Sequence, residues 1–324
     1  MFTNETILIT GGTGTLGAAT VARVLKYAPR EIRILSRNEL SQQRMRQLYK
    51  NAPLKFYLGS VEDEYIVERA IAGCDTVFHY AAMKYADMAE KQPQQTILSN
   101  VVGTMNIVNL AIKYGVNRVV GISTDKAVRP NGVYGMSKKM MEYLFMAAND
   151  GDTATKFFVA RSGNIFGSTG SVVEIWRRAA ANHEALKITD PEMTRLFAGA
   201  DDVVDLIFRM LIHGDPGGIY FTRMKAIKMI DLATEMQSRG VEYSTNRGGE
   251  KIHESLVTGE EMTRAIELTI SGADLPPAPI YMIGNHKLTP DAEDYASDTA
   301  QRMTKDEIGC LIRQYESGRN GQSK

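Results

Sequence analysis

Short apolar runs alternate with longer stretches of helical periodicity through the first half of the chain. Runs rich in β-branched and aromatic residues predict six strands, at Thr6–Thr10, Ile32–Ser36, Leu54–Leu58, Asp75–Tyr80, Arg118–Ser123 and Lys156–Arg161. The stretches between them predict helices. One ends near Tyr27, one begins after Gly59–Asp63, one runs to about Gly115, and one extends from Tyr134 to about Asn149. This alternation predicts an α/β fold with a Rossmann-type doubly wound parallel sheet.

The pattern loosens after Gly163, where Gly163–Gly170 has the composition of a loop. Further on, the sequence predicts helices at Val173–Asn182, Asp201–His213, Ala226–Arg239 and Lys305–Gln314, strands at Leu186–Thr189 and Gly217–Phe221, and a loop-rich segment from Pro276. We therefore expect one domain over residues 1–162 and a smaller part over residues 163–324 that is interleaved with it.

A glycine-rich turn follows the first predicted strand. Its glycines, Gly11, Gly14 and Gly17, have the spacing G-x-x-G-x-x-G and lead into a helix. Glycines let the backbone approach a pyrophosphate, and a helix N-terminus offers free N–H groups to an anion. The turn predicts a dinucleotide site, the alternative being a turn without a ligand. The candidate contacts are Gly11, Thr13, Gly14, Thr15, Leu16 and Gly17.

The end of the second predicted strand bears on the choice of dinucleotide. NAD sites usually have an acidic residue there for the ribose hydroxyls, whereas this strand ends in Ser36, Arg37 and Asn38. A hydroxyl and a guanidinium suit a 2′-phosphate, so we expect NADP, with NAD as the alternative. Small residues after the fourth strand, Ala81 and Ala82, leave room for a flat cofactor. Arg37 could instead be a surface charge, like Arg44 and Arg46.

Residues capable of proton chemistry concentrate between Ser123 and Lys138. Tyr134 and Lys138 are four residues apart and share one face of the predicted helix, where an ammonium would favour the phenolate. Thr124, Asp125 and Lys126 follow the fifth strand, at the sheet edge where ligands bind in open α/β folds. Alternatively, the Tyr–Lys spacing arises by chance and Asp125–Lys126 is a solvated loop pair.

Composition narrows the class of protein to which the chain can belong. The chain has 324 residues, of which 44% are hydrophobic, and 38 basic residues balance 38 acidic ones. No net charge attracts it to nucleic acid or to a membrane surface. Its two cysteines are too few for a disulfide framework or a metal site. Because no signal peptide and no apolar span are evident, we expect a cytoplasmic protein.

Several motifs together resemble a known family. They are Thr10-Gly-Gly-Thr-Gly14, Ser36-Arg-Asn-Glu-Leu40, His79-Tyr-Ala-Ala-Met-Lys84, Asn100-Val-Val-Gly-Thr104, Ser123-Thr-Asp-Lys-Ala127, Tyr134-Gly-Met-Ser-Lys138, Arg161-Ser-Gly-Asn164, Gly167-Ser-Thr-Gly-Ser-Val172, Ile188-Thr-Asp-Pro-Glu-Met-Thr-Arg195, Gly249-Glu-Lys-Ile-His-Glu254 and Tyr295-Ala-Ser-Asp298. The chain resembles the extended short-chain dehydrogenase/reductases. More narrowly, it resembles the inverting UDP-N-acetylglucosamine 4,6-dehydratases of polysaccharide biosynthesis.

This resemblance implies a redox-neutral elimination on a UDP-sugar, with NADP tightly bound and recycled. Tyr134, assisted by Lys138, would take the C4 hydroxyl proton as C4 is oxidised. Lys126 would then remove the C5 proton, which requires a depressed lysine pKa, and Asp125 would protonate the departing C6 hydroxyl. Hydride return to C6 would give a 4-keto-6-deoxy sugar with inverted C5. Thr124 completes the implied catalytic set.

Further site residues carry over from the resemblance. The cofactor set adds Ser60, Val61, Ala81, Ala82, Lys84, Asn100 and Ser123, and the substrate set is Lys84, Asn164, Ser171, Val172, Arg195, Arg247 and Glu250. Arg195 and Arg247 would clamp the diphosphate. His253-Glu254 either belongs to the site or begins a helix. The family also implies a homo-oligomer, often a hexamer.

Departures from the family pattern leave alternatives open. Ser60 stands where the family often has an acid, Ser162 where it has tyrosine, and Leu196-Phe197 where it has Phe-Trp. One alternative is a UDP-sugar 4-epimerase, or a dehydratase with epimerase activity, although a simple epimerase has no use for Asp125-Lys126. Another is a non-catalytic dinucleotide-binding sensor, which would not need the Tyr134–Lys138 pair.

Overall fold

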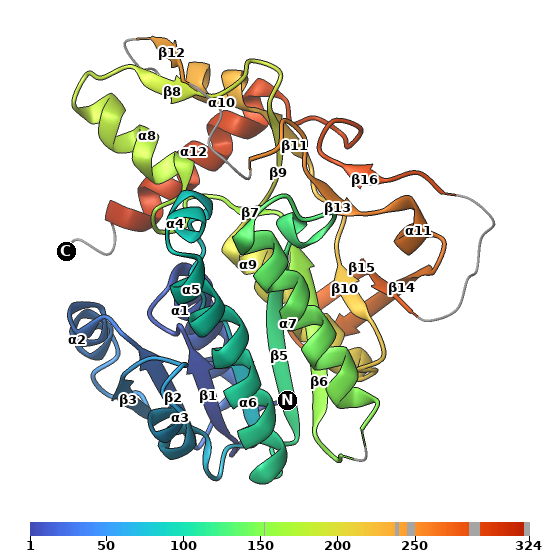
Figure 1. The fold of residues 1–324 in the computed structure, drawn as a ribbon. Coiled ribbons are helices and arrows are strands. Elements are labelled where there is room, and N and C mark those ends of the chain that lie inside the picture. Colours follow the sequence, from blue (N-terminus) through green and yellow to red (C-terminus); the bar gives the residue numbers. More distant parts are fainter. Residues whose placement is uncertain (152, 237–239, 245–249, 285–291, 321–324) are drawn as a thin grey trace.

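A nine-stranded sheet forms the centre of the molecule (Figure 1). The computed structural model describes residues 1–151, 153–236, 240–244, 250–284 and 292–320. The strands of this sheet are β1 (Thr6–Thr10), β2 (Glu31–Ser36), β3 (Leu54–Leu58), β4 (Thr76–His79), β5 (Arg118–Thr124), β6 (Lys156–Ser162), β10 (Ile219–Phe221), β14 (Ala265–Gly272) and β15 (Leu275–Ile283).

The strand order is β14-β15-β10-β6-β5-β4-β1-β2-β3, and all strands from β3 to β10 run parallel. The order reverses between β1 and β4, which is the position where doubly wound sheets bind dinucleotides. The expected Rossmann-type α/β fold is confirmed, and each of the six strands predicted in the first half is present.

The loop expected from Pro276 onward is wrong, because β14 and β15 form an antiparallel hairpin that extends the sheet. Prolines at 276, 277 and 279 made a strand improbable, since proline cannot donate to a ladder. Only Tyr281–Ile283 of β15 pairs with β10, so these prolines lie where the strand has a neighbour on one side alone.

Helices cover both faces of this sheet. Its helical elements are α1 (Thr15–Val24), η1 (Leu25–Tyr27), α2 (Glu39–Leu48), α3 (Glu64–Ile71), α4 (Ala86–Lys91), α5 (Pro93–Ile97), η2 (Leu98–Val102), α6 (Gly103–Lys113), η3 (Asp125–Ala127), α7 (Val133–Asn149) and α9 (Ala200–His213). Ile7 and Ile9 pack on the face covered by α1 and α9, whereas Leu8 packs on the face covered by α3, α6 and α7. Alternating side chains thus build two cores.

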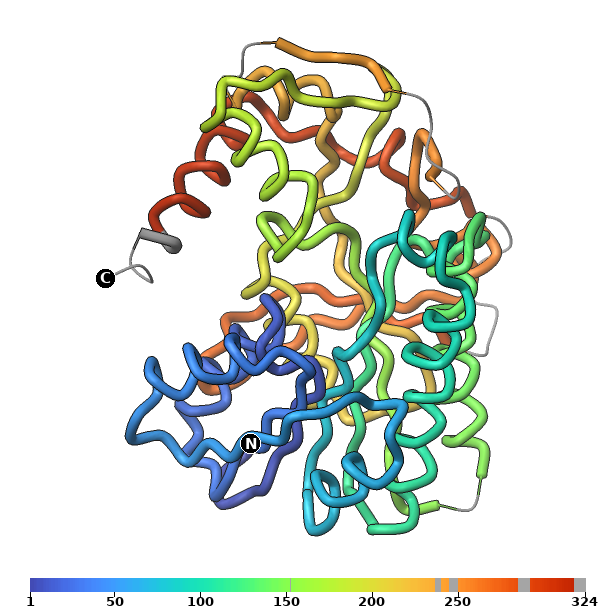
Figure 2. The backbone as a smooth tube through the Cα atoms, turned by 60° about the vertical axis from the view of Figure 1, so that its left-hand side comes forward, coloured from blue at the N-terminus to red at the C-terminus, as the bar shows by residue number. Residues whose placement is uncertain are grey.

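The remaining elements gather beyond the carboxyl ends of the parallel strands (Figures 1 and 2). They are β7 (Asn164–Ile165), α8 (Val172–Ala181), β8 (Leu186–Ile188), β9 (Thr194–Ala198), β11 (Ala226–Lys228), α10 (Met229–Glu235), β12 (Val241–Tyr243), β13 (Ser255–Val257), α11 (Gly259–Met262), β16 (Tyr295–Ala296) and α12 (Lys305–Asn320). A third core around Trp176, Phe197 and Leu232 holds them together.

The helix predicted over Ala226–Arg239 is only partly correct. Its first three residues form β11, which pairs antiparallel with β9, and the helix begins at Met229; residues 237–239 lie outside the described part. Pairing with β9 overrides the local helical pattern. Since β10, β14 and β15 return to the main sheet, the second half is interleaved with the first, while the boundary at residue 162 stays a prediction.

Within the residues that the structure describes, no helix combines the length and apolar character needed to cross a membrane.

Candidate active site

A cavity of about 1120 Å³ lies between the sheet and the elements beyond it. It collects side chains from the ends of β1, β2, β4 and β5, from α7, and from the segments around β7, α8 and β9. Most predicted site residues line it: Gly11, Thr13, Gly14, Thr15, Leu16, Gly17, Ser36, Arg37, Asn38, Ser60, Val61, Ala81, Ala82, Lys84, Ser123, Thr124, Lys126, Tyr134, Lys138, Asn164, Ser171, Val172, Arg195 and Glu250.

The glycine-rich turn connects β1 to α1 at one end of the cavity. Gly11 has a φ of +67°, and a Cβ there would lie 2.8 Å from the backbone nitrogen of Ala81. Glycine is therefore required, both for the left-handed conformation and for the close approach to the loop after β4. Gly14 begins α1 without a side-chain cap, so the first N–H groups of the helix are available to an anion.

The end of β2 offers one charged group to the cavity. The side chain of Asn38 caps α2 by accepting from the Ser41 N–H, and the Ser36 hydroxyl accepts from the Gln42 amide. Both side chains therefore have structural partners, whereas Arg37 is exposed at the cavity wall.

Three buried hydroxyls on the cavity wall, those of Ser60, Ser162 and Ser171, have no hydrogen-bond partner among the described residues. A buried polar atom without a partner costs free energy, of the order of 1–3 kcal/mol. A bound polar ligand could supply these partners, so the wall fits a ligand such as a dinucleotide and a sugar nucleotide. Two of these residues, Ser60 and Ser162, are departures from the family pattern. Leu196, another departure, lies in the core instead.

The proton-active residues come from β5, η3 and α7. Tyr134 and Lys138 lie one turn apart at the start of α7, and both line the cavity, as the spacing predicts. Lys138 is buried and donates to the sulfur of Met141. Burial lowers its pKa to about 8, although the nearby Glu142 raises it.

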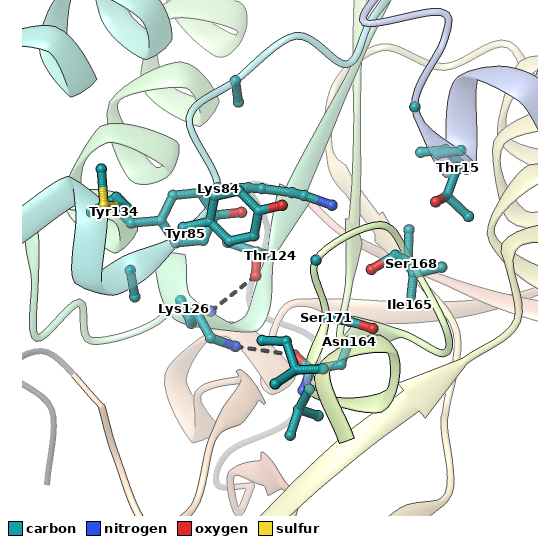
Figure 3. A pocket seen from close by; sticks show the side chains of 18 of the residues that line it. Thr15, Lys84, Tyr85, Thr124, Lys126, Tyr134, Asn164, Ile165, Ser168 and Ser171 are labelled. Atoms are coloured by element: carbon teal, nitrogen blue, oxygen red, sulfur yellow. Dashed lines mark hydrogen bonds between the residues drawn. The ribbon is translucent and has the colours of Figure 1, made fainter. Parts of the chain in front are cut away.

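Asp125 and Lys126 form an ion pair in which Asp125 is buried and the Lys126 side chain is 24% exposed. Lys126 Nζ lies 3.0 Å from Asp125 Oδ1 and 3.1 Å from Asn164 Oδ1, and Asp125 Oδ1 also accepts from the Thr124 hydroxyl at 2.8 Å. Asp125 has no exposed surface, and its Oδ2 has no hydrogen-bond partner among the described residues. Lys126 and Thr124 line the cavity, and Asp125 lies behind them. Figure 3 shows Lys126 between Thr124 and Asn164.

The expectation of a depressed Lys126 pKa is wrong. Burial alone would lower it, but the charges of Asp125 and Glu254 outweigh burial and raise the pKa of Lys126 above its ordinary value. The pKa of Tyr134 is also raised, mainly by burial and further by the negative charge of Asp125, while the positive charge of Lys126 opposes that rise. The site as it stands therefore favours an ammonium and a neutral phenol.

The loop from Gly167 to Ser171 contributes to the cavity wall and is held by side chains from two other segments. The Thr169 N–H donates to the Thr15 hydroxyl at 3.0 Å, and Lys84 Nζ donates to the Thr169 carbonyl at 2.7 Å. Figure 3 shows Thr15 on the far side of the cavity from Tyr134, with Ser168 and Ser171 between them. Lys84, predicted for both cofactor and substrate, thus binds this loop; burial lowers its pKa.

Two residues predicted for the site, Arg195 and Asn100, are hydrogen-bonded mainly to other parts of the protein. Both terminal nitrogens of Arg195 are engaged, by the backbone carbonyls of residues 194, 251 and 252 and by Glu250 at 3.2 Å. Asn100 is buried in η2 and bonds to the backbone of Met83 and to Ser137, so it supports the loop after β4 and does not line the cavity. The second predicted clamp, Arg247, lies outside the described residues.

Sequence reasoning did not place Glu254 beside Lys126. It is 1% exposed and lies 3.9 Å from Lys126 Nζ, just before β13, so the alternative that it begins a helix is wrong. An ionisable residue within the specific motif Gly249–Glu254 was the available signal. Within the described residues, no group of three His, Cys, Asp or Glu side chains could hold a metal ion.

A sequence model of one protein family matches residues 7–271, which is most of the chain. The family is described as polysaccharide biosynthesis protein. The chain belongs to this family. The match spans the dinucleotide turn, the Thr124–Lys126 segment and the start of α7, so it includes the residues that line the cavity.

Relatives within and around the family point to nucleotide sugars. A protein named UDP-glucose 4-epimerase from Rickettsia rickettsii is 36% identical over 331 aligned residues, which cover 96% of each chain. The solved structure of Pen from Bacillus thuringiensis has a TM-score of 0.88 at 27% identity, covering 98% of this chain and 99% of that one. DesIV, a dTDP-glucose 4,6-dehydratase from Streptomyces venezuelae solved with NAD and TYD, has a TM-score of 0.74 at 20% identity, covering 97% and 98%.

The resemblance to the extended short-chain dehydrogenase/reductases is thus confirmed. The chain is an enzyme of the nucleotide-sugar-modifying part of that superfamily. Epimerases and dehydratases both occur among its relatives and structural neighbours.

Proposed function

We propose that this enzyme is an NADP-dependent nucleotide-sugar 4,6-dehydratase acting on UDP-N-acetylglucosamine, with inversion at C5. The observation that carries the proposal is the ion pair of the buried Asp125 with Lys126 on the cavity wall, placed beside Tyr134 at the carboxyl end of β5. An acid and a base in direct contact, next to a phenol on a cavity wall, fit an elimination that follows an oxidation.

The residues of the glycine turn fit a dinucleotide, since Gly11 permits the close turn and the uncapped start of α1 faces the cavity. When bound, the nicotinamide ring would accept hydride from the sugar and return it. Arg37 and the absence of an acid at the end of β2 support NADP over NAD. The loop from Gly167 to Ser171, which is hydrogen-bonded to Thr15 and Lys84, supports tight retention of the cofactor.

At C4, Tyr134 would act as the base that takes the hydroxyl proton as the C4–H bond breaks. Its O–H bond forms and the substrate O–H bond breaks, leaving a C4 ketone. The positive charge of Lys126 favours the phenolate that this step needs.

At C5 and C6, the ketone acidifies the neighbouring C5 proton. Lys126, as a neutral amine, would take that proton, and the electron pair of the broken C–H bond would form the C5–C6 double bond. The C6–O bond then breaks, and Asp125 gives its proton to the departing oxygen, so that water leaves. Hydride would then return to C6, C5 would take a proton as the double bond opens, and Lys126 would release the proton that it had taken. The step requires a protonated Asp125 and a neutral Lys126, and the 3.0 Å contact between them places this acid and base side by side.

Proton balance assigns a further role to Thr124. Over one turnover Tyr134 gains a proton and Asp125 loses one, so a proton must return from the phenol to the carboxylate. Thr124 donates to Asp125 at 2.8 Å and lies beside Tyr134, so its hydroxyl can give its proton to Asp125 as it accepts one from the phenol. The C4 hydroxyl proton would thus end in the water that is released.

The alternative is a UDP-sugar 4-epimerase, or a dehydratase with epimerase activity, and the names of the Rickettsia relatives favour it. A 4-epimerase needs Tyr134 and a hydroxyl such as that of Thr124. It does not need a buried acid and base directed at C5 and C6, which is why we favour the dehydratase. A non-catalytic sensor would require neither Tyr134 with Thr124 nor the Asp125–Lys126 pair.

We also propose a homo-oligomer. The helices α6 and α7 lie side by side (Figure 1), and they expose a set of large apolar side chains: Met105, Ile112, Met136, Met140 and Tyr143, each more than 40% exposed. Contiguous exposed apolar surface is typical of an interface, and a second copy of the chain is the partner that the family resemblance suggests. The cytoplasmic location and the lack of nucleic-acid partners stay predictions.

Mass spectrometry of the product tests the function directly. Purified enzyme incubated with UDP-N-acetylglucosamine should give a product that has lost one water, and UDP-glucose should react more slowly. A product of unchanged mass that elutes as UDP-N-acetylgalactosamine would instead support the epimerase. The variant Lys113→Ala, which changes an exposed lysine on α6, is the control and should behave as wild type.

A further inference from the structure

A second buried carboxylate lies beside the proposed base. Glu254 is 1% exposed, and neither of its carboxylate oxygens has a hydrogen-bond partner within the part of the chain that the structure describes. Its Oε1 lies 3.9 Å from Lys126 Nζ, and its Oε2 lies 3.5 Å from Lys251 Nζ. Burial without a hydrogen bond makes the carboxylate costly and favours its protonation, while the two ammonium groups oppose it.

Charged groups face Glu254 from several elements. Lys126 and Asp125 belong to η3, Arg195 to β9, and Lys251 to the segment that precedes Glu254 itself. Lys251 is already engaged, because its ammonium donates to the Val128 carbonyl at 2.8 Å. Tyr134 of α7 and Glu90 of α4 line the same small cavity as Glu254.

The proposed dehydratase requires Lys126 to be a neutral amine, yet the site stabilises it as an ammonium. Two of its three N–H groups have acceptors, Asp125 and Asn164, at 3.0 and 3.1 Å. The nearest remaining acceptor that could take the third proton is Glu254. Asp125 alone cannot solve the problem, because it must receive its own proton from the C4 side to act as the acid.

We propose that Glu254 is the positioning residue that takes and stores the third proton of Lys126, which leaves the lysine neutral and able to act as the base. The inference rests on the proposed dehydratase. In this step an N–H bond of Lys126 breaks and an O–H bond of Glu254 forms, and the two opposite charges disappear together. The lone pair released on Nζ is the one that accepts the C5 proton.

A small cavity of about 10 Å³ borders Glu254, Lys126 and Lys251. That is about the space that one water molecule requires. A water there would bridge the 3.9 Å between the carboxylate and the ammonium, which is too long for direct transfer.

The electrostatics of the carboxyl support this assignment. Burial raises the pKa of Glu254, and the negative charge of Asp125 raises it further, while Lys126 and Arg195 oppose the rise. A carboxyl whose pKa is raised can keep a proton that an ordinary glutamate would release.

The competing role is that of a charged anchor, and it predicts the opposite effect of one substitution. An anionic Glu254 that only holds Lys126 in place would stabilise the ammonium, so Glu254→Gln would make Lys126 a more available base. If Glu254 stores the proton, the same substitution removes the acceptor and leaves Lys126 charged. Glu254→Asp keeps a carboxyl and should retain part of the activity.

The test follows the exchange of the sugar C5 proton with deuterated water in wild type, Glu254→Gln and Glu254→Asp. Glu260→Gln, an exposed change on α11, is the matched control. We expect Glu254→Gln to slow C5 exchange by about 100-fold, the low end of a general base's contribution. The exchange rate of Glu254→Asp should fall less. In Glu254→Gln alone, the pH profile of the exchange rate should lose its plateau near neutrality. Exchange at or above the wild-type rate in Glu254→Gln would overturn the proposal.

Infrared spectroscopy supplies a readout that does not depend on activity. With ¹³C-labelled glutamate, wild type at neutral pH should gain, when UDP-N-acetylglucosamine binds, the band of a protonated glutamic acid that shifts with the label and is missing in Glu254→Gln. Absence of such a band in wild type overturns the proposal even if Glu254→Gln fails to fold. If wild type neither dehydrates the UDP-sugar nor exchanges C5, the proposed function fails, while the infrared band still decides whether Glu254 holds a proton.

Discussion

A Cβ atom on Gly135 would lie 2.2 Å from the carbonyl oxygen of Lys126. The first turn of α7 is therefore packed directly against η3, with no room for any side chain between them. This contact brings Tyr134, which precedes Gly135, to the same cavity wall as Lys126. The oxidation half and the elimination half of the proposed site meet because one residue in the motif Tyr134–Lys138 is a glycine.

Gly135→Ala should separate these two halves. Overpacking costs typically 1–3 kcal/mol, so the melting temperature should fall by several degrees. We expect turnover to fall more than stability suggests, because Tyr134 or Lys126 must shift to relieve the clash. Thermal unfolding and product formation, measured together, check this. Gly151→Ala is the control, since its Cβ would meet nothing closer than 3.4 Å; equal losses in both variants would contradict the account.

Arg37→Ala tests the preference for NADP. If the exposed guanidinium at the end of β2 contacts the 2′-phosphate, its loss should weaken NADP binding by 1.5–3 kcal/mol, or about 10- to 100-fold, and leave NAD binding nearly unchanged. Calorimetric titration of the two dinucleotides measures both affinities. Arg44→Ala, an exposed change on α2 away from the cavity, is the control. Equal weakening of both dinucleotides would remove Arg37 from the specificity determinants.

The buried network around Arg161 predicts how stability depends on pH. Arg161 has no exposed surface and forms ion pairs with Glu142 and Glu261, which join α7 to α11. Burial opposes the effect, but the bonds to Arg161 lower the pKa of Glu261 from 4.5 to about 2. A depressed carboxyl pKa stabilises the fold above the unfolded value, and this stabilisation is lost as pH falls through the folded value.

Stability should therefore decline between about pH 4.5 and pH 2, with a contribution from Glu261 of the order of 3 kcal/mol. Denaturant unfolding across this range measures it. Glu261→Gln should be less stable than wild type at neutral pH and should lose less stability on acidification. If the stability of wild type and of Glu261→Gln changed with pH in parallel, the pKa of Glu261 would not be depressed in this way.

Met140→Glu tests the apolar face of α6 and α7. Met140 is 47% exposed on α7 between Met136 and Tyr143. A charge at the centre of a homo-oligomer interface is desolvated without a partner, so the assembly should dissociate into smaller species. Light scattering after size exclusion measures the mass. Leu48→Glu on α2, where the side chain is 64% exposed, is the control. An unchanged mass in Met140→Glu would place the interface elsewhere.

The sheet of the first half could be predicted because each strand is a compact apolar run between glycine-rich or polar breaks. The hairpin of β14 and β15 could not, since three prolines obscured a strand whose pairing is settled by distant neighbours. Likewise, Ala226–Lys228 has a helical local pattern but pairs with β9. Local propensity does not report such long-range pairing.

In the candidate site too, local motifs could be read from the sequence, whereas long-range contacts could not. Motif spacing placed Tyr134, Lys138 and Lys126 on one cavity, because these residues follow the ends of parallel strands. The direction of the Lys126 pKa could not be read from the sequence, since it depends on the contact that Asp125 makes in the fold and on Glu254, which is distant in the sequence and lies just before β13. Arg195 shows the converse: its residue type suggested a phosphate ligand, whereas the fold surrounds its guanidinium with carbonyl groups.

The most direct test of the central claim compares wild type with Lys126→Ala on UDP-N-acetylglucosamine in deuterated water, read by proton NMR. The account predicts that wild type releases water and incorporates deuterium at C5. It predicts that Lys126→Ala does neither, although it still binds the dinucleotide. Full dehydration by Lys126→Ala, or epimerisation at C4 without deuterium at C5 in wild type, would contradict it.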